Sequence, residues 1–216
     1  MIRAYQEIYL NKAQSALGDA FDYAINTCQI PGSDFVRLFS ASTASKQIEN
    51  GEPAYIAGKS GIEIAAEIVL ETTRKQLDAE PQEHFGRSAE YWIGWAVCYY
   101  QWFSARSFSD IFTALSFDDL KIMYVTLHEA DITKFVDVAE ERMRDHFKDT
   151  NLKRIRSIYG CTQSELSKRS GVSLRSIQMY EQRNKDINKA SAETLYRISK
   201  VLGCEIEDLL EKQLYY

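Results

Sequence analysis

The chain of 216 residues has few residues of the types that build disulfide-linked or metal-bound folds. Its cysteines are Cys28, Cys98, Cys161 and Cys204, and no two of them form a Cys-x-x-Cys pair. Only 3 histidines occur, and none stands at ligand spacing from a cysteine. Because a disulfide framework or a zinc site needs such pairs, we expect reduced thiols, no bound metal and no cofactor.

Long apolar runs are also missing. No stretch reaches the roughly 18 consecutive apolar residues that a membrane-spanning helix needs. Residues 1–12 lack the basic start and the apolar run of a signal peptide. We therefore expect a cytoplasmic protein that does not enter the membrane.

Two short matches to catalytic motifs break at essential positions. The segment around Lys59 is similar to a phosphate-binding loop, but Pro53 stands where that loop needs its first glycine, and no apolar strand precedes it. His128 and Glu129 begin a zinc-protease motif, but Ile132 replaces its second histidine. The sequence therefore predicts no catalytic site, and we do not expect an enzyme.

Helical periodicity dominates the spacing of the apolar residues, and no alternating run is long enough for a strand. Residues 91–103 are apolar nearly all round a helix, which is typical of a central buried helix. The predicted fold is therefore all-α. The helices expected before the last third of the chain are Ile2–Cys28, Asp34–Ala41 with Ser33 as its cap, Ile62–Lys75, Ser88–Arg106, Asp110–Ala114, Phe117–Leu127 and Asp131–Phe147, with an ordered loop at Gly51–Gly61.

Charge is divided unevenly along the chain, although the whole carries a net charge of −5. Residues 1–150 hold 14 Lys+Arg against 23 Asp+Glu, whereas residues 151–216 hold 12 against 8. A local basic surplus is typical of a surface that meets phosphate. We therefore predict two domains, 1–147 and 151–211, of which only the second contacts nucleic acid.

The stretch Thr162–Gln182 has the signals of two short helices joined by a tight turn. Thr162 and Glu165 form a Thr-x-x-Glu capping box, which defines the start of the first helix. Gly171 suits the φ > 0 conformation of a corner, and Ser173 caps the second helix. The residues expected to face inward are Leu166, Val172 and Ile177. The opposite face of the second helix is then free to contact a partner.

From Leu152 to Leu210 the chain resembles the Xre family, the helix-turn-helix proteins that include the phage Cro and cI repressors. The segments LKRIRSIYG, TQSELSKRSG and VSLRSIQMYE correspond to the first three helices of the family, and ETLYRISKVLGC and EIEDLLE to its closing helices. The resemblance implies a five-helix domain whose third helix reads the major groove. Two departures occur. Ser167 stands where the family usually has alanine, and the longer loop after Glu181 lacks the common glycine and proline.

The resemblance also assigns site residues. Gln163, at the start of the second helix, is expected to bond a phosphate and to brace the reading helix. The residues expected to face the major groove are Ser173, Leu174, Arg175, Gln178 and Met179. Among these, a guanidinium pairs with guanine, an amide with adenine, and an apolar side chain with a thymine methyl. Four basic residues are either neutralisers of the DNA backbone or solvated surface charges: Lys168, Arg183, Lys185 and Lys189.

An aromatic stripe recurs at three- and four-residue spacing in the N-terminal domain: Trp92, Trp95, Tyr99 and Trp102. Such a stripe is typical of a core. If part of it is exposed, it forms a partner or ligand surface together with Tyr55 and Lys59 of the preceding loop, because aromatic residues dominate protein interfaces.

These features predict a sequence-specific transcriptional regulator, a repressor that binds double-stranded operator DNA as a homodimer on an inverted repeat. One form of this hypothesis is an antitoxin whose acidic N-terminal domain binds a toxin-like protein, since Xre-type antitoxins commonly join two such domains. The alternative is a small-molecule-responsive regulator whose ligand pocket is lined by the aromatic stripe.

Overall fold

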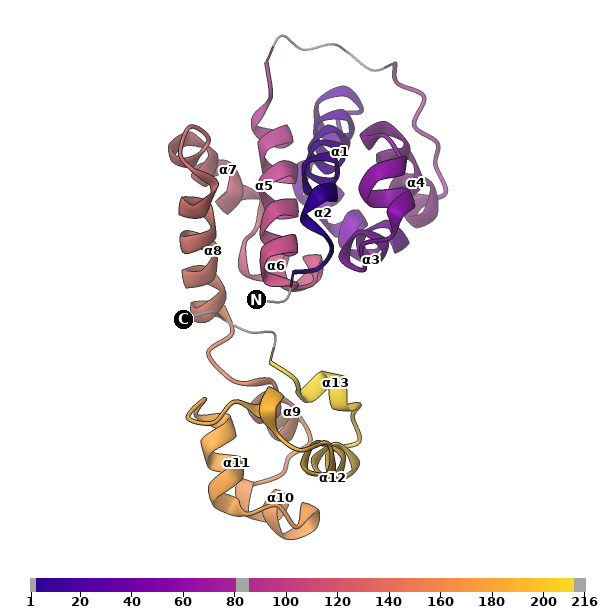
Figure 1. Ribbon diagram of the computed structural model, residues 1–216. Helices are drawn as coiled ribbons and strands as arrows, with labels where there is room; N and C mark the ends of the chain where they lie inside the picture. The colour runs from indigo at the N-terminus through magenta and orange to yellow at the C-terminus, as the bar shows by residue number, and fades with distance from the viewer. Residues whose placement is uncertain (1–2, 81–85, 212–216) are drawn as a thin grey trace. The chain divides into compact units, whose positions relative to one another are not determined.

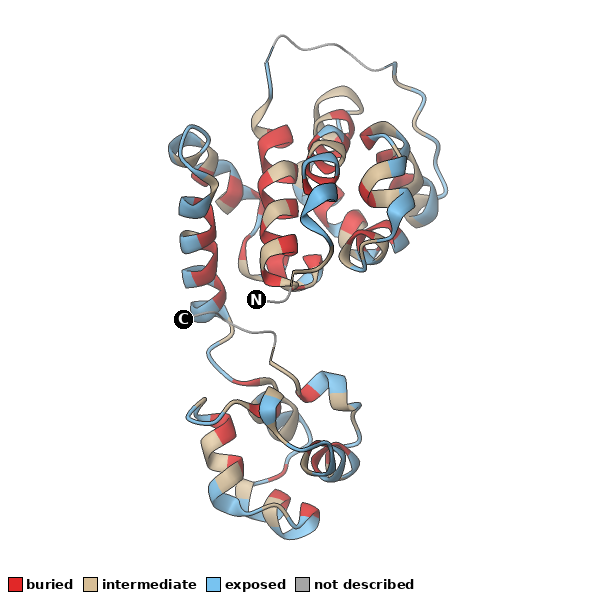
Figure 2. Cartoon of the chain, viewed as in Figure 1, coloured by how far each residue is buried: buried red, intermediate tan, exposed pale blue. Residues whose placement is uncertain are grey.

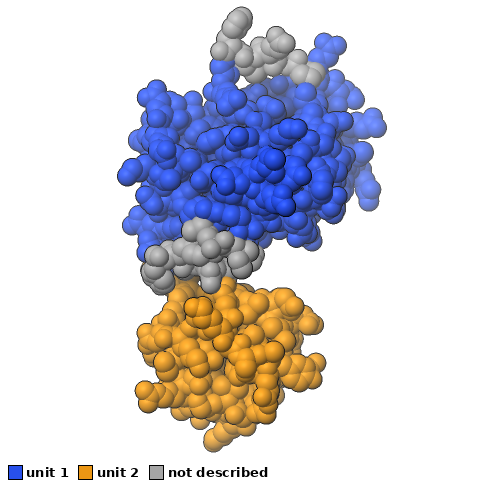
Figure 3. All heavy atoms as spheres, viewed as in Figure 1, with its two compact units in different colours: residues 1–146 blue, residues 147–216 orange. Residues whose placement is uncertain are grey.

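The computed structural model describes residues 3–80 and 86–211, and every regular element in these ranges is helical (Figure 1). The predicted all-α fold is thereby confirmed. The chain divides into two compact units, Met1–His146 and Phe147–Tyr216, which Figure 3 colours separately. They are called unit 1 and unit 2 below.

The helices of unit 1 are α1 (Leu10–Asp22), α2 (Gly32–Ala41), α3 (Thr43–Glu49), α4 (Gly61–Thr73), α5 (Ala89–Ser104), α6 (Phe108–Ala114), α7 (Phe117–Leu127) and α8 (Ile132–His146). Shorter elements are the 3-10 turn η1 (Glu7–Tyr9) and the π-turns η2 (Tyr23–Thr27) and η3 (Ala54–Gly58). Serine hydroxyls accept a backbone N–H at the starts of α3 to α7, namely Ser42, Ser60, Ser88, Ser107 and Ser116. These caps explain why the helices begin at these residues.

Helix α5 is the centre of unit 1, as its apolar sequence predicts. Figure 2 shows buried residues on most sides of α5, whereas α8 is buried along one side only. Helix α1 lies directly against α5, because a β-carbon on Gly94 would be only 2.5 Å from the carbonyl oxygen of Leu17. The two backbones therefore touch with no side chain between them.

Phenylalanine rings fill the space beside this helix pair. The ring of Phe21 from α1 packs edge-on against Phe35 and Phe39 of α2, at centroid distances of 5.1 and 5.8 Å. Phe39 in turn meets Phe108 of α6 at 4.7 Å. On the other side of α5, the Trp92 ring packs against Phe135 of α8 at 5.5 Å. Aromatic rings thus fill a large part of the core of unit 1, beside aliphatic residues such as Ile64 and Ile68 of α4.

The prediction of one helix over Ile2–Cys28 is wrong in its bounds, and Ile2 itself lies outside the described residues. The α-helix starts only at Leu10, and its last turns widen into η2. Residues 3–5 are instead bonded to α5: the Ala4 amide donates to the Trp102 carbonyl at 3.1 Å, and the Trp102 indole donates to the Tyr5 carbonyl at 2.8 Å. These long-range bonds compete successfully with local helix formation.

Other predicted boundaries shift by one to two residues. Ser33 is not the cap of α2, because the helix already starts at Gly32 and the Phe35 amide donates to the Pro31 carbonyl. Helix α6 begins before Asp110, since Ser107 accepts the Asp110 amide. The loop at Gly51–Gly61 is ordered, as expected, and buries Ile56.

Unit 2 contains α9 (Asn151–Ile158), α10 (Gln163–Ser170), α11 (Leu174–Glu181), the 3-10 turn η4 (Ile187–Lys189), α12 (Ala192–Leu202) and α13 (Ile206–Leu209). Its core is small. The buried residues are Leu152, Cys161, Leu166, Ile177, Tyr180, Ile187, Leu195, Ile198, Leu202 and Leu209. Every helix of the unit contributes to this cluster, so the unit has a single core shared by all five.

Candidate nucleic-acid interface

The start of α10 has the predicted capping box. The Thr162 hydroxyl accepts the Glu165 amide at 3.1 Å, and the Glu165 carboxylate accepts the Thr162 amide at 2.8 Å. The bonds that the Thr162 backbone and side chain donate to this carboxylate hold the pKa of Glu165 below its usual value. Both ends of the first turn are thereby satisfied, which fixes where α10 begins.

The corner between α10 and α11 follows the expected chemistry. Gly171 adopts φ +70, and its amide donates to the Ser167 carbonyl. The Ser167 hydroxyl donates to the Val172 carbonyl at 2.7 Å, which gives this departure from the family pattern a structural role across the turn. Ser173 then caps α11 by accepting the Ser176 amide at 3.1 Å. Because this hydroxyl also bonds the Ser176 hydroxyl, Ser173 is engaged within the protein.

Helix α11 has one buried face and one outward face. Ile177, Tyr180 and Glu181 are buried, and Leu166 of α10 packs into the same core, as predicted for Ile177 and Leu166. On the other face Arg175 is exposed. Leu174 keeps 38% of its surface. The remaining two predicted reading residues, Gln178 and Met179, are half-buried. The helix thus presents a mixed cationic, amide and apolar surface on its outward side.

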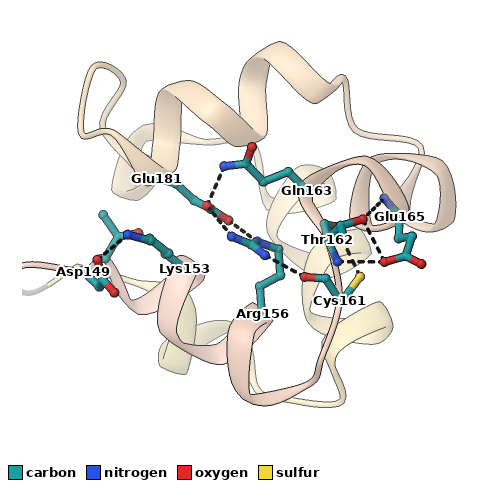
Figure 4. A network of polar contacts seen from close by, with 9 residues as sticks. Asp149, Lys153, Arg156, Cys161, Thr162, Gln163, Glu165 and Glu181 are labelled. Atoms are coloured by element: carbon teal, nitrogen blue, oxygen red, sulfur yellow. Dashed lines mark hydrogen bonds and ion pairs between the residues drawn. The ribbon is translucent and has the colours of Figure 1, made fainter.

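A buried charge network ties α11 to the rest of unit 2 (Figure 4). The Arg156 guanidinium on α9 donates to both carboxylate oxygens of Glu181, at 2.6 and 2.8 Å, and to the Cys161 carbonyl at 2.6 Å. The side-chain nitrogen Nε2 of Gln163 donates to the same carboxylate at 2.7 Å. The bond to Glu181 raises the pKa of Arg156 above its usual value.

The network gives Gln163 the bracing contact that was expected of it, because it joins the first turn of α10 to the last residue of α11. One amide hydrogen is used in this bond, and the second stays available to another acceptor. Arg156 and Glu181 were missed by the sequence reasoning. They lie 25 positions apart, so no local spacing connects them.

The basic residues divide into two groups. Lys168, Lys185 and Lys189 are exposed, and the Lys185 ammonium lies 5.1 Å from the centre of the Tyr180 ring. Arg183 differs, because its guanidinium donates to the Lys148 carbonyl at 2.8 Å and to the Phe147 carbonyl at 3.0 Å. Among these four residues, Arg183 could approach a phosphate only by breaking hydrogen bonds inside the unit, and the Lys189 ammonium lies 3.8 Å from the Asp186 carboxylate.

Two further polar residues follow the reading helix and were not singled out from the sequence. Gln182 and Asn184 are both exposed, and the Asn184 amide donates to the Gln182 side-chain oxygen at 3.1 Å. Gln182 is seven positions after Arg175 and three after Met179, so it extends the outward stripe of α11 by about one turn. A period count continued past Glu181 would have found it.

The partner or ligand surface suggested for unit 1 is only partly on the outside. Trp92 and Trp102 are buried, whereas Trp95 and Tyr99 are half-buried. The other two residues belong to a different segment. The Lys59 ammonium lies 4.0 Å from the Tyr55 ring and donates to the Glu67 carboxylate at 2.5 Å.

In residues 3–80 and 86–211, no group of three His, Cys, Asp or Glu side chains is placed to hold a metal ion. All four cysteines are free thiols, and burial raises the pKa of Cys98 to about 12. No helix within the same ranges has both the length and the apolar character to cross a membrane.

Comparison with known families agrees with this geometry. The family model described as helix-turn-helix matches residues 152–209, which are α9 to α13. No curated protein and no solved structure matches the chain. The matched residues include the capping box, the glycine corner and the outward face of α11. The C-terminal third of the chain is therefore an Xre-type helix-turn-helix domain, similar to those of Cro and cI, and the protein is a DNA-binding transcription regulator.

Proposed function

We propose that this protein is a sequence-specific repressor that acts in the cytoplasm on an operator of double-stranded DNA. The observation that carries the proposal is the outward face of α11, where exposed Arg175 stands beside Gln178 and Met179 while Ile177 lies in the core. A guanidinium can fork onto guanine, an amide onto adenine, and a thioether can pack on a thymine methyl. Each good pair contributes about 1–3 kcal/mol of discrimination between bases.

The proposed repressor works as a homodimer. One helix-turn-helix unit has a single reading helix of eight residues, which contacts only a few base pairs. Tight specific binding needs a larger interface. A symmetric pair would read two half-sites about 34 Å apart, so the operator should be an inverted repeat. Sedimentation of the protein with and without operator DNA tests this part, and a monomer in both states would contradict it.

Unit 1 is assigned the regulatory contact. Its residues 1–146 carry 13 Lys+Arg against 22 Asp+Glu, a balance that repels the phosphate backbone. An acidic surface suits a basic protein partner, and a small toxin-like protein is the specific form that we propose. In that form the protein is an antitoxin that represses its own operon.

The test of sequence reading starts with selection of a binding site from random duplexes by the wild-type protein. Arg175→Ala should then lose about 1–3 kcal/mol at one position of the selected site and relax the preference there. The matched control is Lys200→Ala, which removes one positive charge from the exposed surface of α12. The control should keep the base preference at every position.

The readout separates two kinds of contact. If Arg175→Ala weakens binding to selected and random DNA by the same factor, Arg175 contacts phosphate, and the assigned reading face is wrong. If the wild-type protein selects no sequence at all, it is not a sequence-specific repressor.

A further inference from the structure

Resting on the proposed reading of DNA by α11, we propose that Arg183 is a positioning residue. It fixes the C-terminal end of α11 to the segment by which the chain enters unit 2, instead of neutralising DNA phosphate. Arg183 follows Gln182, the C-cap residue of α11. Three independent features of its surroundings support this role.

The first feature is the backbone conformation. Arg183 adopts φ +56, in the left-handed region that favours glycine. This is the loop in which the Xre pattern commonly has a glycine that this chain lacks. A residue with a β-carbon costs on the order of 1 kcal/mol in that conformation. The conformation persists only where the surrounding contacts of the residue offset that cost.

The second feature is the set of acceptors around the guanidinium. It donates to the carbonyls of Lys148 and Phe147 at 2.8 and 3.0 Å, and it lies 3.4 Å from a carboxylate oxygen of Glu211. The two carbonyls are bound by different terminal nitrogens of the guanidinium, so both arms of its planar fork are used, whereas a lysine offers a single nitrogen. The Arg183 side chain is only 27% exposed, so these bonds are partly shielded from water.

The third feature is that the acceptors are themselves held. The other oxygen of the Glu211 carboxylate accepts the Asn151 amide at 2.5 Å, and the Glu211 amide donates to the Asn188 side-chain oxygen at 2.9 Å. The Asn151 side chain donates to the Leu210 carbonyl at 2.7 Å. The start of α9, the turn η4 and the segment after α13 thus meet at one place, and Arg183 connects α11 to it.

At its C-terminal end α11 is held by the Arg156–Glu181 pair and, one step further along the chain, by this connection. At the other end the helix is set by the Ser173 cap and the glycine corner. Past Glu181, the Arg183 amide donates to the Tyr180 carbonyl and the Lys185 amide donates to the Met179 carbonyl. These two bonds join the loop to the last turn of α11. Loss of the Arg183 guanidinium bonds would therefore remove the tie between that turn and the segment before α9, and would leave the Arg156–Glu181 pair as the polar contact that holds it.

Lys185 offers a matched control, because it lies two positions away in the same loop and is exposed. The experiment compares Arg183→Gly, Arg183→Lys and Lys185→Ala in the full chain, on the selected site and on random duplex over a range of salt concentrations. Arg183→Gly relieves the backbone strain and Arg183→Lys keeps the charge, so both variants are expected to fold. Far-UV circular dichroism checks this.

We expect both Arg183 variants to bind the selected site about tenfold more weakly. Their binding to random DNA and the slope of affinity against salt should equal those of the wild type, because no phosphate contact is lost. Lys185→Ala should weaken binding to both DNAs alike and reduce the slope by about 1. Amide hydrogen exchange at Lys185 should accelerate in both Arg183 variants.

Two results would overturn the proposal. Full recovery of the wild-type preference by Arg183→Lys would show that charge alone matters. A lower salt slope in Arg183→Gly would place Arg183 on phosphate. Failure of the proposed function gives a different result from failure of the Arg183 proposal. In that case the wild-type protein itself would select no site, and Arg183 would have no reading helix to position.

Discussion

The two units bury different kinds of side chain. Unit 1 is held by aromatic rings such as Phe21 and Phe39 and by direct backbone contact between α1 and α5. Unit 2 has a small apolar cluster and adds a charge network in which Arg156 and Gln163 share the Glu181 carboxylate. A small domain buries a smaller fraction of its surface than a large one. Unit 1 also buries polar groups, such as the Tyr100 hydroxyl that donates to the Glu140 carboxylate. Because the apolar core of unit 2 is smaller, we expect polar contacts to contribute a larger share of its stability.

The chain itself supplies a way to measure the two units separately. All 3 tryptophans, Trp92, Trp95 and Trp102, belong to unit 1. Tryptophan fluorescence therefore follows the unfolding of unit 1, whereas far-UV circular dichroism follows the helices of both units.

The largest effect is expected from Glu181→Ala in unit 2. The Glu181 side chain is 2% exposed and that of Arg156 13%, so the change leaves a buried guanidinium without its partner. Removing one member of a buried pair costs about 3–5 kcal/mol. As denaturant is added, unit 2 of the variant should unfold first, which adds a step at low denaturant to the circular dichroism curve. The midpoint of the tryptophan fluorescence curve, which reports unit 1, should not change.

The matched control for this change is Asp149→Ala. Asp149 also forms an ion pair within unit 2, with Lys153 at 2.6 Å, but its side chain is 56% exposed. Exposed pairs contribute less than about 1 kcal/mol. If Glu181→Ala were no more damaging than Asp149→Ala, the contrast between the units would be lost.

A smaller effect is expected from Gly94→Val in unit 1. The new side chain meets the Leu17 carbonyl, so α1 and α5 must separate. Overpacking of this kind costs about 1–3 kcal/mol. The tryptophan transition should move to lower denaturant, and Gly86→Ala, where a β-carbon meets open space, should leave it unchanged. An equal shift of the helical signal from unit 2 would contradict separate stabilisation.

The smallest effect expected is on the stability of unit 1 at low pH. Burial raises the pKa of Glu90, but hydrogen bonds from Lys121 and Asn26 outweigh burial and lower it below the usual value. A group whose pKa is lowered by folding stabilises the protein above its unfolded pKa of about 4.3, and this contribution is lost as the pH falls through the folded pKa. Since Lys121 is 55% exposed, solvent weakens the pair.

Glu90→Gln is the variant that checks the acid prediction. It should lower the stability of unit 1 at pH 7, measured by tryptophan fluorescence in denaturant, and the difference from the wild type should shrink as the pH falls below about 4. Glu7→Gln, on the exposed turn η1, serves as the control. A difference that stayed constant from pH 7 to pH 3 would show that the charge of Glu90 plays no part.

Features of the structure that depend on interactions between residues close in the sequence could be predicted from the sequence. Helix α7 has the predicted bounds Phe117–Leu127, because its capping box with Ser116 is local. The faces of α11 followed from periodicity alone, since Ile177 is buried and Arg175 exposed. In both cases the determining residues lie within a few positions of one another, which is the range that a sequence pattern covers.

Long-range contacts could not be read in this way. Residues 3–5 leave the helical pattern because they bond to Trp102, nearly a hundred positions away. The Arg156–Glu181 pair joins helices whose spacing depends on the whole fold of unit 2. The sequence does not distinguish Arg183 from the other basic residues of its loop, because the carbonyls that it binds belong to residues 147 and 148, about 35 positions earlier in the chain.

The close approach of α1 to α5 limits how unit 1 could respond to a small molecule. A ligand entering between these helices would have to pull apart two backbones that already touch at Gly94 and Leu17, with the Tyr91 ring pressed against Gly18 beside them. The pair should therefore move as one rigid body. A change of shape in unit 1, whether caused by a ligand or a protein, must then be carried by helices such as α8, whose outer side is free of the core.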